Sequence, residues 1–183
     1  MRPQISRADR YDAVTITFHW LTAALVLTLF GTAMAWTYLP RDLGLRWLES
    51  VHVSLGIGLA AVLIGRLVWR PTAGRKLAEP PGNRAVVLAS KLVHFALYGL
   101  LIAQVALGFG IEWAGGQGLS FFGLFTLPSP FTGDRALAHQ FEEIHGVVAW
   151  SLIVLAGGHA MAALWHHYGA RDGVPRRMIP GRG

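Results

Sequence analysis

Residues 144–161 read IHGVVAWSLIVLAGGHAM, an apolar run that holds two histidines, His145 and His159, and no charged side chain. A buried imidazole must hydrogen-bond, pair with a charge or bind a metal, because leaving it unsatisfied costs several kcal/mol. As a helix, this run would place the two histidines about 21 Å apart along its axis and nearly on one face. That distance is a large fraction of the thickness of a bilayer.

Three further stretches are free of Asp, Glu, Lys and Arg, namely residues 13–40, 50–65 and 92–111. A helix needs about 17–25 predominantly apolar residues to cross the hydrocarbon, and residues 50–65 reach that length once their snorkelling ends are counted. The whole chain is 53% hydrophobic and 14% charged, whereas an ordinary soluble domain has about 25% charged residues. The sequence therefore predicts an all-α, polytopic membrane protein.

We expect one domain over residues 1–183, folded as a bundle of four transmembrane helices with short connections. The helices are predicted at residues 14–38, 49–69, 85–112 and 138–168, with Arg70-Pro71 stopping the second. Residues 113–133, WAGGQGLSFFGLFTLPSPFTG, are also uncharged, but their five glycines and two prolines would leave backbone groups unsatisfied in lipid. This stretch is expected to be an interfacial loop rather than a fifth span.

The placement of charge supports four spans and predicts their orientation. All but three of the 16 Lys and Arg residues lie on the side of the two termini and of the loop between the second and third helices. The other three, Arg41, Arg46 and Arg135, lie on the opposite side with six of the 10 acidic residues. The positive-inside rule then puts both termini in the cytoplasm. The net charge of +6 reflects topology and contact with anionic lipid, so no nucleic-acid partner is needed to explain it.

The chain has no cysteine. This excludes cysteine-ligated iron–sulfur clusters, covalent haem attachment through a C-x-x-C-H motif, and disulfides. Any redox centre would have to be held by histidine without a thioether bond.

Four histidines within the predicted spans fall at two depths. His19 and His159 lie toward the cytoplasmic side, and His52 and His145 lie toward the outer side. Histidines inside a membrane are functional hypotheses by default. A haem iron takes an axial nitrogen on each side, which two facing helices can supply. The pattern predicts two haems, with metals about 21 Å apart by helix rise, that carry electrons across the membrane.

Small residues beside the ligands would let a flat macrocycle approach the backbone. Such residues are Gly56, Gly58, Gly146, Gly157 and Gly158. The alternative for each histidine alone is a hydrogen bond to Ser or Thr on a neighbouring helix. Four histidines in two level-matched pairs are much harder to produce by chance.

Other polar residues leave alternatives open. His94 lies close to the level of His19 and His159, where it would replace one of them as a ligand, hydrogen-bond a haem propionate or quinone, or merely be satisfied. Arg66 either snorkels or pairs with a haem propionate. His166, in the segment LWHHY, belongs either to an interfacial belt or to a quinone site.

Four segments in order resemble the bacterial cytochrome b561 family: FHW at 18–20, VHVSLG at 51–56, IHG at 144–146 and GGHAMAALWHHY at 157–168. With the loop GLFTLPSP and the tail RRMIP, the similarity covers nearly the whole chain. The resemblance implies a four-helix bundle with two b-type haems. It implies that His19 and His159 ligate the cytoplasmic-side haem and that His52 and His145 ligate the periplasmic-side haem. His94 matches a family histidine that is not an axial ligand.

The resemblance also implies electron exchange with ubiquinone or another membrane quinone. Some members of the family resemble superoxide oxidases, oxidoreductases that take an electron from periplasmic superoxide and reduce ubiquinone. The outer loops, with three basic and six acidic residues, sum to a formal charge of −3, which opposes long-range steering of an anion. Arg41, Arg46 or Arg135 would have to form a local funnel.

Two rival functions remain. The first is a membrane-anchor cytochrome that relays electrons from a partner hydrogenase or dehydrogenase to quinone. The short outer loops offer such a partner little docking surface, which favours a self-contained enzyme. The second is a transporter that uses histidines for protons or metal, and the spans carry too few polar groups for its pathway.

Overall fold

Four long helices make up most of the computed structural model, which describes residues 10–40, 43–45, 47–77, 83–130, 132–171 and 173–179. The helices are α1 (Ala13–Tyr38), α2 (Trp47–Thr72), α3 (Arg84–Ala114) and α4 (Arg135–Trp165). A π-helical turn (His166–Ala170) and a 3-10 helix (Val174–Met178) follow α4. All four helices are long and apolar enough to cross a membrane, so the predicted number of spans is confirmed.

Polar side chains mark where three of the helices begin. Asp12 accepts a hydrogen bond from the Thr15 amide at 2.8 Å, and Asn83 accepts one from the Ala85 amide at 2.9 Å. Asp134 accepts bonds from two amides in the first turn of α4. Such N-caps satisfy donors that the helix itself leaves free, each contributing about 1 kcal/mol. Helix α1 therefore starts where its uncharged run starts, whereas α3 and α4 start at caps that precede theirs by about two turns.

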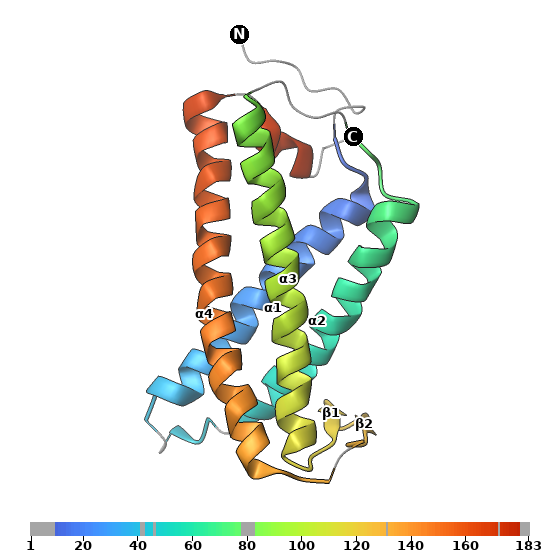
Figure 1. The fold of residues 1–183 in the computed structure, drawn as a ribbon, viewed down its shortest axis with the longest axis vertical. Coiled ribbons are helices and arrows are strands. Elements are labelled where there is room, and N and C mark those ends of the chain that lie inside the picture. The colour runs from blue at the N-terminus through green and yellow to red at the C-terminus, as the bar shows by residue number, and fades with distance from the viewer. Residues whose placement is uncertain are drawn as a thin grey trace.

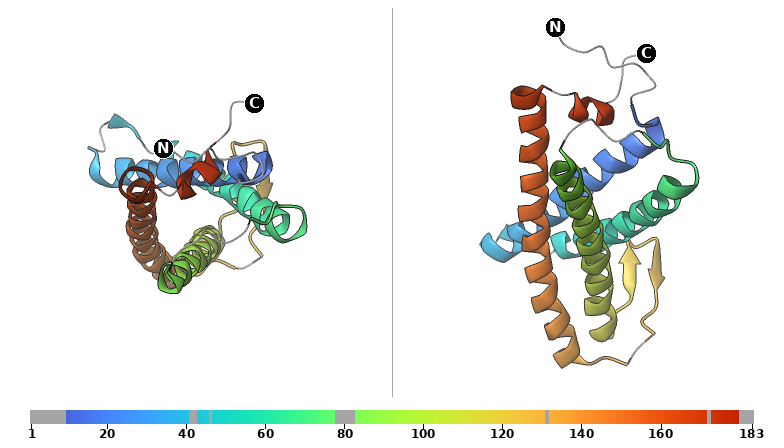
Figure 2. Two further views of the ribbon diagram at one scale, coloured as in Figure 1. Left: turned by 90° about the horizontal axis from the view of Figure 1, so that it is seen from above. Right: turned by 45° about the horizontal axis from the view of Figure 1, so that its top comes forward.

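The helices pack as two pairs. Helix α3 lies along α4, and α1 lies along α2. The pair of α1 and α2 runs obliquely to the pair of α3 and α4 (Figures 1 and 2). The start of α1 and the end of α4 lie at one end of the bundle, which we call the inner end, and the opposite end is the outer end (Figure 1).

The core of the bundle lies between the two histidine levels. It is a cluster of buried leucines that draws on all four helices: Leu29, Leu59, Leu63, Leu101 and Leu152. On α4, Leu152 is midway between His145 and His159 in the sequence. Large apolar side chains such as Phe95 and Val154 stay 80% and 70% exposed. Their exposure fits a bundle whose outside faces lipid, where apolar side chains need no burial against protein.

Two details of the predicted elements are wrong. Helix α2 continues past Pro71 to Thr72, because a proline near the end of a helix removes one backbone hydrogen bond without forcing the chain to turn at once. The uncharged loop contains a short antiparallel hairpin, β1 (Leu119–Phe121) and β2 (Phe125–Leu127). Pairing satisfies backbone groups that an irregular loop would leave free.

The hairpin is anchored on α2 by one buried serine. Ser54 is fully buried, and its hydroxyl lies 3.2 Å from the Ser120 carbonyl and 2.9 Å from the Phe122 amide. Phe122, with a φ of 48°, lies in the left-handed region at the turn and is half exposed. The hairpin therefore covers the outer part of α2, beside the turn that carries His52.

Candidate functional site

At the outer level, the structure brings His52 of α2 and His145 of α4 together. Their ring centroids are 6.3 Å apart, with 68° between the ring planes. Two imidazole nitrogens that bind one metal ion from opposite sides, each at about 2 Å, place the ring centroids about 6 Å apart. The separation of the two rings therefore fits a shared metal ion.

His52 is already oriented by α1. Its Nδ1 lies 3.0 Å from the Leu29 carbonyl oxygen and 3.2 Å from the Thr32 hydroxyl. When Nδ1–H donates to the carbonyl, Nε2 keeps its lone pair, which is the usual arrangement of a metal-binding histidine. The edge of the Trp36 ring packs against the imidazole at a centroid distance of 5.0 Å.

His145 is held by α3. Its Nε2 lies 2.9 Å from Nε2 of Gln104, and its ring lies beside Gly108. The Nδ1 of His145 is buried without a hydrogen-bond partner among the described residues, as is Oε1 of Gln104. The sequence analysis missed Gln104. The sequence does single out Gln104, because it is the only amide side chain between Lys91 and Glu112.

At the inner level, three imidazoles gather rather than two. His94 and His159 have ring centroids 5.1 Å apart, and His19 interacts electrostatically with both. The Nδ1 of His94 lies 2.7 Å from the Ser90 carbonyl oxygen, so that His94 also has a fixed tautomer with a free Nε2. Proximity alone therefore leaves both His19 and His94 as partners for His159.

Arg66 lies within the inner group. One guanidinium nitrogen is 3.4 Å from Nδ1 of His19, and the guanidinium carbon is 5.0 Å from the centroid of the Tyr98 ring. A guanidinium only donates, so Nδ1 of His19 accepts here. A metal bound at Nε2 of His19 would leave the proton on Nδ1. Arg66 would then have to turn toward an acceptor elsewhere.

Open space adjoins the glycines near the histidines. A Cβ added at Gly56, Gly58, Gly146, Gly157 or Gly158 would meet no atom within 4 Å. No cluster of three or more His, Asp or Glu side chains in the described ranges is suited to a metal ion. Paired imidazoles with room beside them suit a metal whose remaining ligands come from a flat non-protein group.

The predicted residues near the inner surface lie apart from these pairs. His166 begins the π-helical turn, and its amide bonds to carbonyls of the last turn of α4. The ring of His167 packs on Tyr168 at a centroid distance of 4.7 Å. The structure thus places His166 at the inner end, beyond the level of His159.

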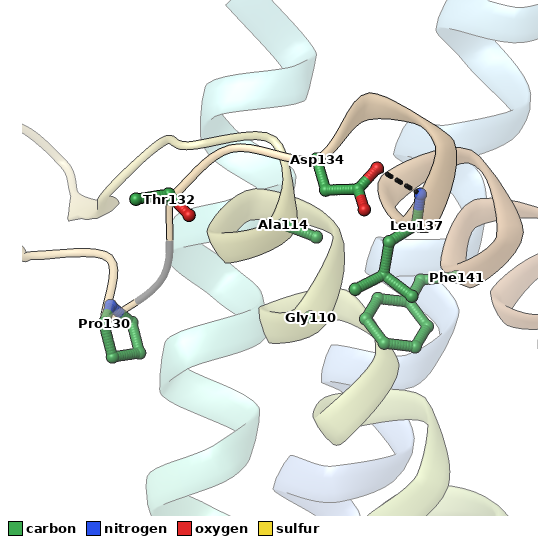
Figure 3. A pocket seen from close by; sticks show the side chains of 7 residues that line it. All are labelled: Gly110, Ala114, Pro130, Thr132, Asp134, Leu137 and Phe141. Carbon is green, nitrogen blue, oxygen red and sulfur yellow. Dashed lines mark hydrogen bonds between the residues drawn. The ribbon is translucent and has the colours of Figure 1, made fainter.

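A hollow of about 560 Å³ opens at the outer end, about one helical turn from His145. Figure 3 shows Leu137 and Phe141 at its wall, and Asp134 with its carboxylate bonded to the Leu137 amide. The other lining residues are Gly110, Ala114, Pro130 and Thr132. These described lining residues include no basic side chain, so the hollow offers an anion no favourable charge. Arg41 and Arg46, two members of the predicted basic funnel, lie outside the described residues.

Comparison with known proteins gives consistent results. Residues 10–181 match the family model described as prokaryotic cytochrome b561. Cytochrome b561 homolog 2 of Escherichia coli (strain K12) is 33% identical, with 93% of this chain and 92% of that protein aligned. A probable superoxide oxidase, CybB, of Yersinia pestis is 27% identical over 93% of this chain and 96% of its own. Cytochrome b562 of Cereibacter sphaeroides is also 27% identical, over 92% and 94% of the two chains.

Proposed function

We propose that this chain, which belongs to the prokaryotic cytochrome b561 family, carries two b-type haems and transfers electrons across a bacterial inner membrane to the quinone pool. Membership of the family implies b-type haem. The number of haems and the direction of transfer are our inference. The observation that carries it is the 6.3 Å apposition of His52 and His145, with a second group of imidazoles on the far side of the leucine core.

In this proposal His52 and His145 are the axial ligands of the outer haem, and His19 and His159 are those of the inner haem. Each haem would supply an iron that alternates between the ferrous and ferric states. The Leu29 carbonyl fixes the tautomer of His52, and Gly56 leaves room beside α2. The leucine core between the levels excludes water and holds the two sites at a constant separation.

The inner residues have accessory roles in the proposal. Arg66 is expected to turn from His19 to a haem propionate, because a guanidinium and a carboxylate pair strongly in a low dielectric. His94 supports His159 or hydrogen-bonds the quinone. His166, on the inner rim, is assigned to the quinone site. In this orientation both chain termini are cytoplasmic, as the positive-inside rule predicts from the distribution of Lys and Arg.

Superoxide is one candidate donor at the outer end. Two superoxide ions would give two electrons and two molecules of dioxygen, and ubiquinone would take the two electrons with two protons to form ubiquinol. The similarity to a probable superoxide oxidase supports this donor. The excess of acidic residues at the outer loops opposes steering of an anion.

The excess of acidic residues favours a second candidate, a basic redox partner such as a dehydrogenase or hydrogenase subunit that docks at the outer end. Complementary charge would speed such an encounter. The short loops would limit the area buried.

The first test is the reduced-minus-oxidised spectrum of the purified protein, with haem quantified per chain. We expect two b-type haems, reduced by superoxide added at the outer side and reoxidised by ubiquinone. One haem or none under haem-replete expression would contradict the two-site assignment. If two haems are present but superoxide fails to reduce them rapidly, the partner-subunit function takes its place.

A further inference from the structure

We propose that the inner ends of α1 and α2 form a binding site for the phosphate headgroup of an anionic phospholipid, with Arg70 and Arg75 as its main cations. The site lies apart from the two histidine levels, and the inference does not depend on the haem assignment. It gives a specific role to arginines that the positive-inside rule explains only as topology.

Basic side chains gather where α1 begins and α2 ends, two segments that lie side by side at the inner end (Figure 1). Over the whole sequence, the side of the two termini carries all but three of the 16 basic residues and only four of the 10 acidic residues. The described basic residues of this group are Arg10, Arg70, Arg75, Lys76, Arg176 and Arg177. Such an excess of positive charge attracts anions.

Two guanidiniums are held at neighbouring residues of the chain. Nη2 of Arg70 donates to the Tyr11 hydroxyl at 3.3 Å, and its guanidinium carbon lies 4.6 Å from the centroid of the Tyr11 ring. Nη1 of Arg75 donates to the Arg10 carbonyl at 3.2 Å, and Nη1 of Arg70 donates to the Arg75 carbonyl at 3.1 Å. Two like charges held in this way repel each other. A phosphate between them would offset the repulsion, because a guanidinium binds a phosphate more strongly than a neutral carbonyl.

The one carboxylate that the described residues place at this end is already used. The oxygens of Asp12 accept hydrogen bonds from the Thr15 amide and hydroxyl, the Trp69 indole and the Arg75 amide. A carboxylate has about four lone-pair sites, so these four donors fill them. Asp12 therefore holds the ends of α1 and α2 together. Within the described residues, its single negative charge leaves most of the positive charge at this end unbalanced.

The C-terminal segment brings further cations to the same place. The Arg177 carbonyl accepts from the Tyr11 amide at 3.1 Å, and the Met178 carbonyl accepts from the Trp20 indole at 2.9 Å. These bonds tie the 3-10 helix, which also carries Arg176, to the start of α1. Exposed tryptophans such as Trp20 are typical of the headgroup level of a membrane. The site thus draws on three segments of the chain at the depth where lipid phosphates lie.

An apolar face of α2 leads away from the arginines into the membrane. Ile64, Leu67 and Val68 are exposed, at 63%, 41% and 58%, and their spacing puts them on one face of the helix. Arg70 follows Leu67 by three residues and so continues that face toward the inner end. A phospholipid combines a charged headgroup with long apolar chains that can lie along such a face. This combination is why we assign a lipid rather than a soluble anion.

The net charge of the lipid should decide how tightly it binds. Basic pockets between transmembrane helices bind anionic headgroups, and each Lys or Arg near an anionic surface changes the affinity by about 5-fold. A zwitterionic lipid brings a cation of its own, which the arginines would repel. We therefore expect the wild type to prefer an anionic lipid, and removal of one guanidinium to lower its affinity by about 5-fold.

The experiment measures phosphatidylglycerol bound to the full-length chain, purified in detergent with its cofactor, by native mass spectrometry. Phosphatidylcholine is the zwitterionic comparison. Arg70→Gln and Arg75→Gln each remove one charge from the site, and Arg75→Gln keeps the main-chain bonds of residue 75 to Asp12 and Arg70. Arg84→Gln is the matched control, because Arg84 is exposed at the start of α3, which packs along α4. The control should keep the wild-type affinity.

The outcomes separate a built site from a diffuse attraction. A loss of phosphatidylglycerol affinity in Arg70→Gln or Arg75→Gln, with wild-type affinity in Arg84→Gln, supports the site. Equal losses in all three variants, or unchanged affinity in both site variants, would overturn it, and so would equal binding of the two lipids by the wild type. Equally tight binding of glycerol phosphate, which has no acyl chain, would overturn the assignment to a lipid. If Arg70→Gln does not fold, Arg75→Gln decides in the same way.

Discussion

The outer and inner histidine groups lie at opposite ends of one leucine core, and they are built differently. At the outer level two imidazoles face each other, each with a hydrogen-bond partner from a third or fourth helix. At the inner level three imidazoles and a guanidinium share the space, and the closest ring pair is His94 with His159. The outer site thus consists of one imidazole pair, whereas the inner site has a third imidazole and a guanidinium beside it.

The largest effect should come from removing an outer ligand. His52→Ala or His145→Ala leaves one axial position without its imidazole, and no other described imidazole contacts this pair. Each variant should bind one haem per chain instead of two, measured by the haem content of the purified protein. His139→Ala is the control, because His139 is exposed beside Glu143 at the outer surface. Two haems per chain in either outer variant would contradict the assignment of His52 and His145 as the axial ligands of one haem.

At the inner level the effect of removing a histidine should depend on which one is removed, because three imidazoles lie there. If His19 and His159 are the ligands, His19→Ala loses the inner haem, and His94→Ala keeps it with an altered quinone reaction. Haem content and the rate of haem reoxidation by ubiquinone distinguish these effects. Loss of the inner haem in His94→Ala with retention in His19→Ala would show that His94, and not His19, is the axial ligand.

A smaller effect is expected from crowding the outer site. In Gly108→Ala the new Cβ would lie 3.3 Å from Cε1 of His145, so that the imidazole must shift by a few tenths of an ångström. We expect partial occupancy of the outer haem or an altered outer spectrum. Gly99→Ala on the same helix is the matched control, because its Cβ would meet nothing within 4 Å. Equal behaviour of the two variants would argue against close packing of His145 on α3.

The smallest effect concerns Asp12, which ties the start of α1 to the end of α2. Its carboxylate accepts hydrogen bonds from the Trp69 indole at 3.0 Å and from the Arg75 amide at 2.9 Å. Partial burial raises the pKa of Asp12, but these bonds and those from Thr15 outweigh it and hold the pKa well below its ordinary value. Asp12→Asn keeps one acceptor for the N-cap but loses the charge and the second carboxylate oxygen, and it should cost about 1 kcal/mol, as loss of one net hydrogen bond does.

The dependence on pH follows from the sign of that shift. Because the folded pKa lies below the unfolded value of 3.8, the carboxylate stabilises the fold above that pH, and the stabilisation is lost as the pH falls toward the folded pKa. Thermal unfolding of the wild type and of Asp12→Asn should therefore differ at neutral pH and converge in acid. A constant difference at all pH values would show that the charge of Asp12 contributes nothing.

The number of spans and the two histidine depths could be predicted because both depend only on the sequence within each helix. Uncharged runs of sufficient length must be helical in lipid, and the rise of a helix converts sequence position into depth. The hairpin at residues 119–127 was not predictable in this way, because its strands, LSF and FTL, have three residues each, and the alternation of apolar and polar residues marks a strand only over about four to eight residues. Its pairing depends on Ser54, which lies 66 positions from Ser120 in the chain.

The sequence by itself determined that this is a four-span membrane protein with histidines near each end, because lipid leaves a charge-free chain few other folds. Only the tertiary structure decided which groups meet the histidines: the Leu29 carbonyl at His52, Gln104 and Gly108 at His145, and His94 at His159. The physical reason is that depth is a property of one helix. Rotation and tilt are set by packing between helices, and a change of a few tens of degrees would give each imidazole a different partner.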